Sequence, residues 1–244
     1  MLNISLTAEK LFQIGPLWVT NSLLTTWIVM LFLVILALII RAGLKERPGT
    51  LQLLAEGLVG GIYGFFQTIL GNNTGKFFPL VGSIFIFLIF INWAGLLPGV
   101  GSIGLEKIGL EGEKEFIPLF RAGSADLNTS LALALISMIT IQLVGIKALG
   151  VDYLRRFFNF RNPLSFYVGV LELVSEFSKV ISFSFRLFGN IFAGEVLLAV
   201  IAFLIPIIAP IPFLGMEIFV GFIQALVFSM LTAVFINAAI VKEH

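Results

Sequence analysis

Five apolar stretches, each long enough to cross a lipid bilayer, alternate with polar or basic segments along this chain. The hydrocarbon layer of a bilayer is about 30 Å thick, and a crossing helix therefore needs about 20 apolar residues. The predicted spans are residues 22–40, 77–97, 127–146, 163–205 and 213–241. The pattern predicts an all-α polytopic membrane protein with about five membrane-crossing helices in a single transmembrane domain, residues 1–244.

Residues 51–70 show a different pattern, with polar side chains on one helical face and apolar ones on the other. This pattern is typical of an amphipathic helix that lies in the membrane interface. The alternative is an ordinary span, which the pairs of small residues in this segment would help to pack. The distribution of basic residues favours the interfacial helix, because they then gather on one side, the cytoplasmic side. These residues are Arg41, Lys45, Arg47, Lys76, Lys147, Arg155, Arg156, Arg161 and Lys242.

The last two predicted helices are too long for upright spans. A continuous helix over residues 163–205 would be about 64 Å long, roughly twice the thickness of the hydrocarbon layer. It would have to tilt by about 60° from the membrane normal, which exceeds the usual range for helices surrounded by lipid. We therefore expect both helices to be strongly tilted and supported by a large protein partner.

The connecting segments complete the predicted topology. Residues 98–125 form an external loop in which a short hairpin is possible, and Asp126 is expected to cap the third span. Prolines 206, 210 and 212 predict a turn before a last helix that begins at Phe213. Five crossings place the N-terminus outside and the C-terminus in the cytoplasm.

Composition excludes several classes of function. The chain is 59% hydrophobic and 12% charged, and its net charge of +1 gives no basis for nucleic-acid binding. It has no cysteine, and its single histidine is the last residue, His244. We therefore expect no cofactor, no disulfide and no metal site built from cysteine or several histidines.

The segment 163–205 carries ionisable residues that a membrane helix normally lacks. Ionisable side chains inside a membrane are costly and usually mark function. Five polar side chains fall within about 80° of one another around the predicted helix and form one stripe. They are Glu172, Lys179, Ser182, Arg186 and Asn190. Glu195 lies on the opposite side of the helix, about 13 Å beyond Arg186.

These residues suit the passage of protons or other cations. Glu172 is predicted toward the cytoplasm, whereas Glu195 and Glu217 are predicted toward the outside. Gln224 lies two helical turns beyond Glu217 on the same face. Polar groups at different depths would line water-filled access paths from the two membrane faces. Because arginine stays protonated, Arg186 would prevent these paths from joining and would favour the ionised form of a carboxyl brought near it.

Most of these polar residues also admit a purely structural interpretation as ion pairs, headgroup contacts or helix–helix hydrogen bonds. The residues with such an alternative are Glu172, Glu176, Lys179, Asn190, Glu195, Glu217, Gln224, Asn92 and Gln142. Arg186 is the hardest to explain structurally, because the nearest acidic residues on its own face are ten or more positions away.

Several sequence strings resemble subunit a of F-type rotary ATP synthases. The most specific is SFRLFGNIFAGE at 184–195, which ELVSEFSK precedes at 172–179 and GFIQALVFSMLTAVFI follows at 221–236. NWAGLLPG at 92–99 and SADLNTSLALAL at 124–135 are also similar to segments of that subunit. The resemblance implies a stator subunit whose last two helices lie against a rotating ring of c subunits. It also implies contacts with the b-subunit peripheral stalk, with other subunits of the complex and with membrane lipid.

The resemblance assigns roles residue by residue. Arg186 matches the essential arginine of the family, which faces the ring carboxylate and separates two offset half-channels for H⁺ or Na⁺. Glu217 occupies a position where some members have histidine. Other residues that match the ion path, or are expected along it, are Asn190, Glu195, Gln224, Glu172 and Ser182. The chain has no phosphate-binding GxxxxGK[ST] motif, and ATP chemistry is expected on other subunits.

Two other functions fit the same composition: a self-contained secondary transporter and a noncatalytic membrane scaffold. A transporter would move solute without other subunits, and a scaffold would tolerate neutral substitution of Arg186. The expected location is the cell (inner or plasma) membrane, in preference to an organellar membrane.

Overall fold

The computed structural model describes residues 7–97, 99–100, 103–108, 114–151, 153, 157, 162–206 and 208–240. Its long helices are α1 (Asn21–Ala42), α2 (Thr50–Leu70), α3 (Thr74–Ala94), α4 (Leu127–Leu149), α6 (Pro163–Leu204) and α7 (Pro210–Ile240). Within the described residues, five helical segments are long and apolar enough to cross a membrane, counting α2 and α3 as one. The predicted all-α polytopic membrane protein is confirmed.

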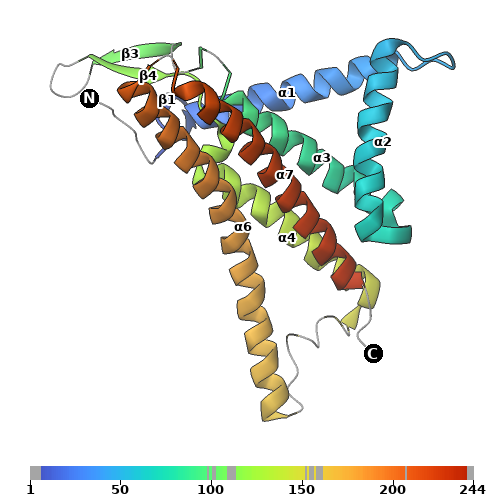
Figure 1. Cartoon of the computed structure of the whole chain (residues 1–244). Helices are drawn as coiled ribbons and strands as arrows, with labels where there is room; N and C mark the ends of the chain where they lie inside the picture. Colours follow the sequence, from blue (N-terminus) through green and yellow to red (C-terminus); the bar gives the residue numbers. More distant parts are fainter. Residues whose placement is uncertain are drawn as a thin grey trace.

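The centre of the molecule is formed by α3, α4, α6 and α7. Helix α3 packs along α7, and α4 packs against both α6 and α7 (Figure 1). Lipid is as apolar as the protein interior, and membrane helices therefore associate through close packing of small residues and van der Waals contact. Gly221 of α7 illustrates this, because an added Cβ would lie 3.2 Å from Asn92 and 3.3 Å from Trp93 on α3.

The two C-terminal helices are long, as predicted. Helix α6 spans 42 residues and is therefore about 63 Å long, and its first half extends away from the other helices (Figure 1). Helix α7 begins at Pro210, earlier than the predicted start at Phe213. Pro210 and Pro212 lie in its first turn, where backbone N–H groups have no helical acceptor and proline is tolerated. The sequence prediction treated these two prolines as helix breakers and was wrong there.

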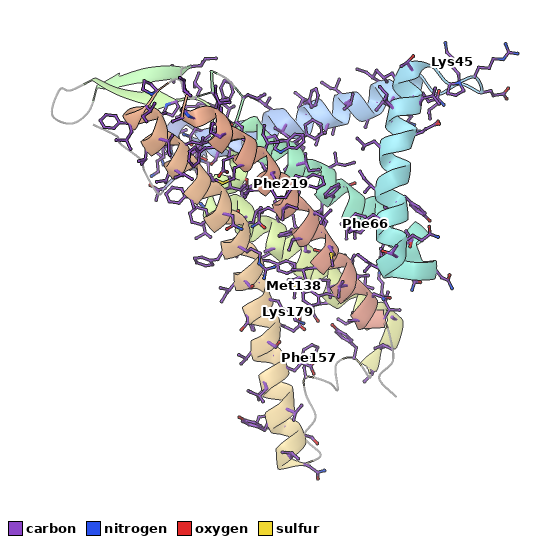
Figure 2. The ribbon with its side chains drawn as sticks, in the orientation of Figure 1. Lys45, Phe66, Met138, Phe157, Lys179 and Phe219 are labelled. Atoms are coloured by element: carbon purple, nitrogen blue, oxygen red, sulfur yellow. The ribbon has the colours of Figure 1, made fainter. Side chains whose placement is uncertain are left out.

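Helix α2 coincides with the predicted amphipathic segment 51–70. It crosses the ends of α1 and α3 and does not run alongside α1 (Figure 1). Phe66 is buried and points toward α3, where its ring lies edge-on to that of Phe85 (Figure 2). Asn237 of α7 donates a hydrogen bond to the carbonyl of Ile69. An orientation in the plane of the membrane interface stays a prediction.

Two β-hairpins lie together at one end of the molecule (Figure 1). The first pairs β1 (Lys10–Ile14) with β2 (Leu17–Thr20), within the segment that sequence analysis did not assign. The second pairs β3 (Gly104–Ile108) with β4 (Lys114–Pro118) and is the hairpin considered possible in the loop 98–125. A 3₁₀ turn, η2 (Gly123–Ala125), then leads into α4.

Asp126 caps α4, as predicted. Its Oδ1 accepts a hydrogen bond from the backbone N–H of Asn128 at 3.0 Å. Its Oδ2 accepts one from the Ser22 hydroxyl of α1, also at 3.0 Å, so that the cap also joins two helices. Several basic residues used to predict topology lie outside the described residues, namely Arg155, Arg156, Arg161 and Lys242.

Candidate functional site: two polar clusters on the last helices

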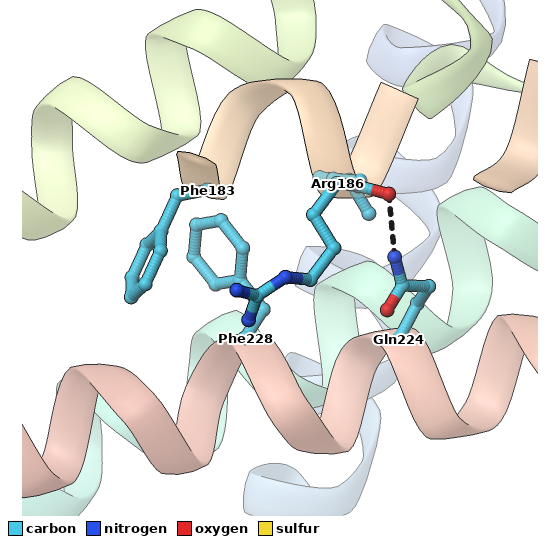
Figure 3. A pocket seen from close by; sticks show the side chains of 5 residues that line it. Phe183, Arg186, Gln224 and Phe228 are labelled. Atoms are coloured by element: carbon cyan, nitrogen blue, oxygen red, sulfur yellow. Dashed lines mark hydrogen bonds between the residues drawn. The ribbon is translucent and has the colours of Figure 1, made fainter. Parts of the chain in front are cut away.

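Arg186 lies on α6 at its seam with α7. Phe183 and Leu187 of α6 are buried, and the ring of Phe183 lies 5.0 Å from that of Phe228 on α7. These contacts fix the rotation of α6 and leave the Arg186 side chain on the exposed side of the seam. Figure 3 shows the guanidinium beside Phe228, between the two helices.

Gln224 fixes the two helices to each other at the level of Arg186. It is buried, and its Nε2 donates a 2.6 Å hydrogen bond to the backbone carbonyl of Arg186 (Figure 3). Of the structural alternatives considered for Gln224, the contact observed is a helix–helix hydrogen bond, with its acceptor on α6. The bond holds the backbone that carries the arginine.

Few polar groups of the described chain contact the positively charged guanidinium of Arg186. Its Nη2 donates to the hydroxyl of Ser182 at 3.3 Å. In the part of the chain that the structure describes, no carboxylate forms an ion pair with it. Within the described residues, the positive charge of Arg186 is therefore not balanced by a carboxylate, although an unpaired charge in apolar surroundings is costly.

A second polar cluster lines a cavity of about 200 Å³ nearer the hairpins. Its walls come from α3, the segment between β4 and η2, α6 and α7. The polar and charged residues in these walls are Asn92, Arg121, Glu195 and Glu217. The cavity is large enough to hold several water molecules.

Glu217 is buried in the wall of this cavity. Its side chain is only 4% exposed, and among the described residues it has no hydrogen-bonding or ion-pairing partner. Its carboxyl group lies directly against the backbone of Gly194 on α6, where an added Cβ would collide with it. The glycine of the AGE string therefore provides the space that the α7 carboxyl occupies.

Glu195 forms an ion pair that sequence analysis did not identify. Its Oε2 accepts a hydrogen bond from Nε of Arg121 at 3.0 Å. The Arg121 guanidinium also lies 5.7 Å from the centre of the Phe192 ring. The sequence offered one weak signal, a basic residue in a loop predicted to lie outside, where such residues are less common.

Asn92 connects three elements behind the cavity. It is buried, its Nδ2 donates to the carbonyl of Gly221 at 2.9 Å, and its Oδ1 accepts from the Ser124 hydroxyl at 2.5 Å. The prediction that this amide serves helix packing agrees with these contacts.

Among the described residues, neither Lys179 nor Asn190 forms a hydrogen bond with a member of either cluster. Lys179 pairs with Glu176 at 2.6 Å and lies over the Phe235 ring of α7, which removes it from the predicted stripe. Glu172 is half-buried about 20 Å before Arg186 along α6. Asn190 is exposed one turn beyond Arg186. The structure thus groups Arg186, Ser182 and Gln224 in one cluster, and Glu195 and Glu217 in the other.

Comparison with known proteins gives a consistent result over almost the whole chain. Residues 23–237 match the family described as ATP synthase A chain. The protein named ATP synthase subunit a from Gloeobacter violaceus is 37% identical over 239 residues, which cover 96% of this chain and 89% of the relative. ATP synthase subunit a 2 from a Bradyrhizobium species is 32% identical, with 98% and 97% covered. ATP synthase subunit a from Geotalea daltonii is also 32% identical, with 92% and 89% covered.

Proposed function

Since the chain belongs to the ATP synthase A chain family, we propose that this multi-pass membrane protein is the ion-conducting stator subunit of a rotary ATP synthase. It would provide two offset half-channels that load and unload H⁺ or Na⁺ on the carboxylates of a rotating c-ring. The observation that carries the proposal is Arg186, a guanidinium without an acidic partner in the described chain, on the exposed side of the α6–α7 seam.

The outer half-channel uses the cavity beneath the hairpins. An ion enters this cavity at Glu217 and Glu195, passes Asn190 and neutralises a ring carboxylate. A neutral carboxyl group can move into lipid, whereas an ionised one would carry a large desolvation cost. The buried position of Glu217 and the water-sized space around it support this assignment.

The inner half-channel lies toward the first half of α6. After nearly a full turn of the ring, the carboxyl reaches Glu172 and Ser182 and releases its ion to the cytoplasm. The bare carboxylate is then attracted to Arg186, which completes the cycle and prevents direct passage between the half-channels. Each elementary charge that crosses about 100 mV supplies about 2.3 kcal/mol, and several ions must therefore pass for each ATP made.

The same proposal gives the partners and the location. The c-ring would face Arg186, and the b-subunit stalk with other subunits would hold the chain against rotation. The protein would lie in the plasma membrane with its N-terminus outside and its C-terminus in the cytoplasm. The organisms of the relatives above and the five apolar helical segments support this location.

Replacement of Arg186 by alanine tests the proposal. In an assembled complex, Arg186→Ala should abolish ATP synthesis and ATP-driven ion pumping, while ions leak passively between the half-channels. Lys179→Ala is the matched control, because it removes a cation two turns away on the same helix that already pairs with Glu176. This control should keep most of the activity. ATP synthesis by normally assembled Arg186→Ala complexes would refute the blocking role.

A further inference from the structure

We propose that Arg121 is a positioning residue that holds Glu195 in a fixed ion pair, so that Glu217 is the carboxyl group of the outer cavity that exchanges the transported ion. The inference rests on the proposed function, because it assigns different roles to the two acidic residues of the outer half-channel: Glu195 is held in an ion pair and Glu217 exchanges the ion. It also gives a role to Arg121, a residue that sequence analysis did not identify.

Arg121 is held on several sides and has little freedom to move. Its backbone N–H donates to the hydroxyl of Thr25 on α1 at 3.2 Å, and its Nη1 donates to the carbonyl of Thr7 at 3.4 Å. The Phe192 ring of α6 covers its guanidinium. The side chain is only 6% exposed. An arginine anchored in this way presents Nε to Glu195 in a fixed direction.

The ion pair makes Glu195 a poor carrier of a transported ion. Binding of a proton or Na⁺ to Glu195 would remove the negative charge that balances the guanidinium, whose Nε contacts Oε2 at 3.0 Å. Arginine does not lose its proton in proteins, and the Arg121 cation, 6% exposed, would then be buried without a counterion. The pair therefore stays ionised and internally neutral while ions pass.

Glu217 has the opposite surroundings. The residue is buried, whereas Glu195 is half-buried, yet no described residue donates a hydrogen bond to Glu217. Its negative charge must be balanced by water or by an ion in the cavity. Contact with Gly194 places its carboxyl group at the α6–α7 seam, on the helices that also carry Arg186 and Gln224.

Counting the charges gives the number of ions exchanged. The charged residues that line the cavity are Arg121 before η2, Glu195 on α6 and Glu217 on α7, while α3 contributes the neutral Asn92. With both carboxylates ionised the three groups carry a net charge of −1, and one bound cation makes them neutral. The cavity therefore exchanges one cation at a time, which matches delivery to one ring carboxylate.

A double-mutant cycle in the assembled ATP synthase tests the roles assigned to Arg121, Glu195 and Glu217. Arg121→Gln and Glu195→Gln should each strongly reduce ATP-driven pumping, because each leaves one charge of the pair without its partner. The double variant Arg121→Gln/Glu195→Gln should pump at least about tenfold faster than either single variant, as expected for directly coupled charges. Glu217→Gln should be inactive both alone and in the double-variant background.

The dependence of passive conductance on outer pH separates positioning from simple structural support. In Arg121→Gln, Arg121 no longer balances the Glu195 carboxylate, and the midpoint of conductance against outer pH should differ from the wild-type value. The midpoint should return toward the wild-type value in the double variant. These measurements use complexes whose content of this chain is checked on native gels.

Two results would overturn the inference. If the double variant pumps no better than Glu195→Gln, then Glu195 itself carries the ion. If Glu217→Gln pumps normally, then Glu217 does not. Arg186→Ala, measured in the same membranes, distinguishes failure of this inference from failure of the proposed function. ATP synthesis by this variant would refute the proposed function, whatever the Arg121 variants show.

Discussion

Replacing Gly194 by alanine tests how closely conduction depends on the position of one carboxyl group. The added Cβ would collide with the carboxyl group of Glu217, and normal van der Waals contact requires a separation of at least about 3.4 Å. The carboxyl group must therefore move by about 1 Å or more. It has space to do so, because it borders the cavity of about 200 Å³.

The expected cost in stability is small and the expected cost in function is large. Rotation of the Glu217 side chain away from its preferred conformation costs about 0.5–1.5 kcal/mol. If the helices separate instead, overpacking costs about 1–3 kcal/mol. A displacement of about 1 Å at a reacting group can reduce a rate about 100-fold. We therefore expect Gly194→Ala complexes to assemble but to lose most ATP-driven pumping and passive conductance.

Two further variants make the assay specific. Gly215→Ala is the matched control, since an added Cβ at this α7 position has open space within 4 Å and should leave conduction unchanged. Adding Glu217→Asp to Gly194→Ala shortens the displaced side chain by one methylene and should recover part of the conductance. Proton pumping is measured in inverted membrane vesicles with equal amounts of assembled complex. Wild-type pumping by Gly194→Ala would show that the position of Glu217 does not limit conduction.

Two other predictions concern the contacts that hold the cavity walls together. Asp126→Ala removes the cap of α4 and the acceptor of the Ser22 hydroxyl, and should destabilise the chain by about 1–3 kcal/mol, whereas Asp126→Asn keeps an acceptor oxygen and should cost less. A lower temperature at which the detergent-solubilised complex releases this chain would show the effect, and equal temperatures for Asp126→Ala and wild type would contradict it. Asn92→Ala leaves the buried Ser124 hydroxyl without its acceptor and should also cost about 1–3 kcal/mol. Adding Ser124→Ala should then lower the release temperature little further, and a fully additive loss would argue against their hydrogen bond.

The long helices could be predicted from the sequence, which also singled out Arg186 as a candidate functional residue. Apolar stretches of sufficient length identify membrane helices, because the bilayer imposes one thickness on every span. The nearest acidic residues on the face of Arg186 are ten or more positions away, and within the described residues no carboxylate pairs with it, although Ser182 of the same helix accepts a hydrogen bond from it. The sequence pattern assigned Lys179 to the same polar stripe as Arg186. In the structure its side chain turns toward Glu176 and the Phe235 ring instead.

Which polar groups share a site depends on how the helices and loops pack against one another. Arg121 contacts Glu195 because the segment before η2 lies against α6, and Gly194 leaves space for Glu217 where α6 packs against α7. Local periodicity cannot supply this information, because lipid-facing and protein-facing residues are equally apolar in a membrane. The hydrophobic pattern therefore predicts which segments form membrane helices, whereas close packing between helices determines that Glu195 pairs with Arg121 and that Glu217 has no hydrogen-bonding partner among the described residues.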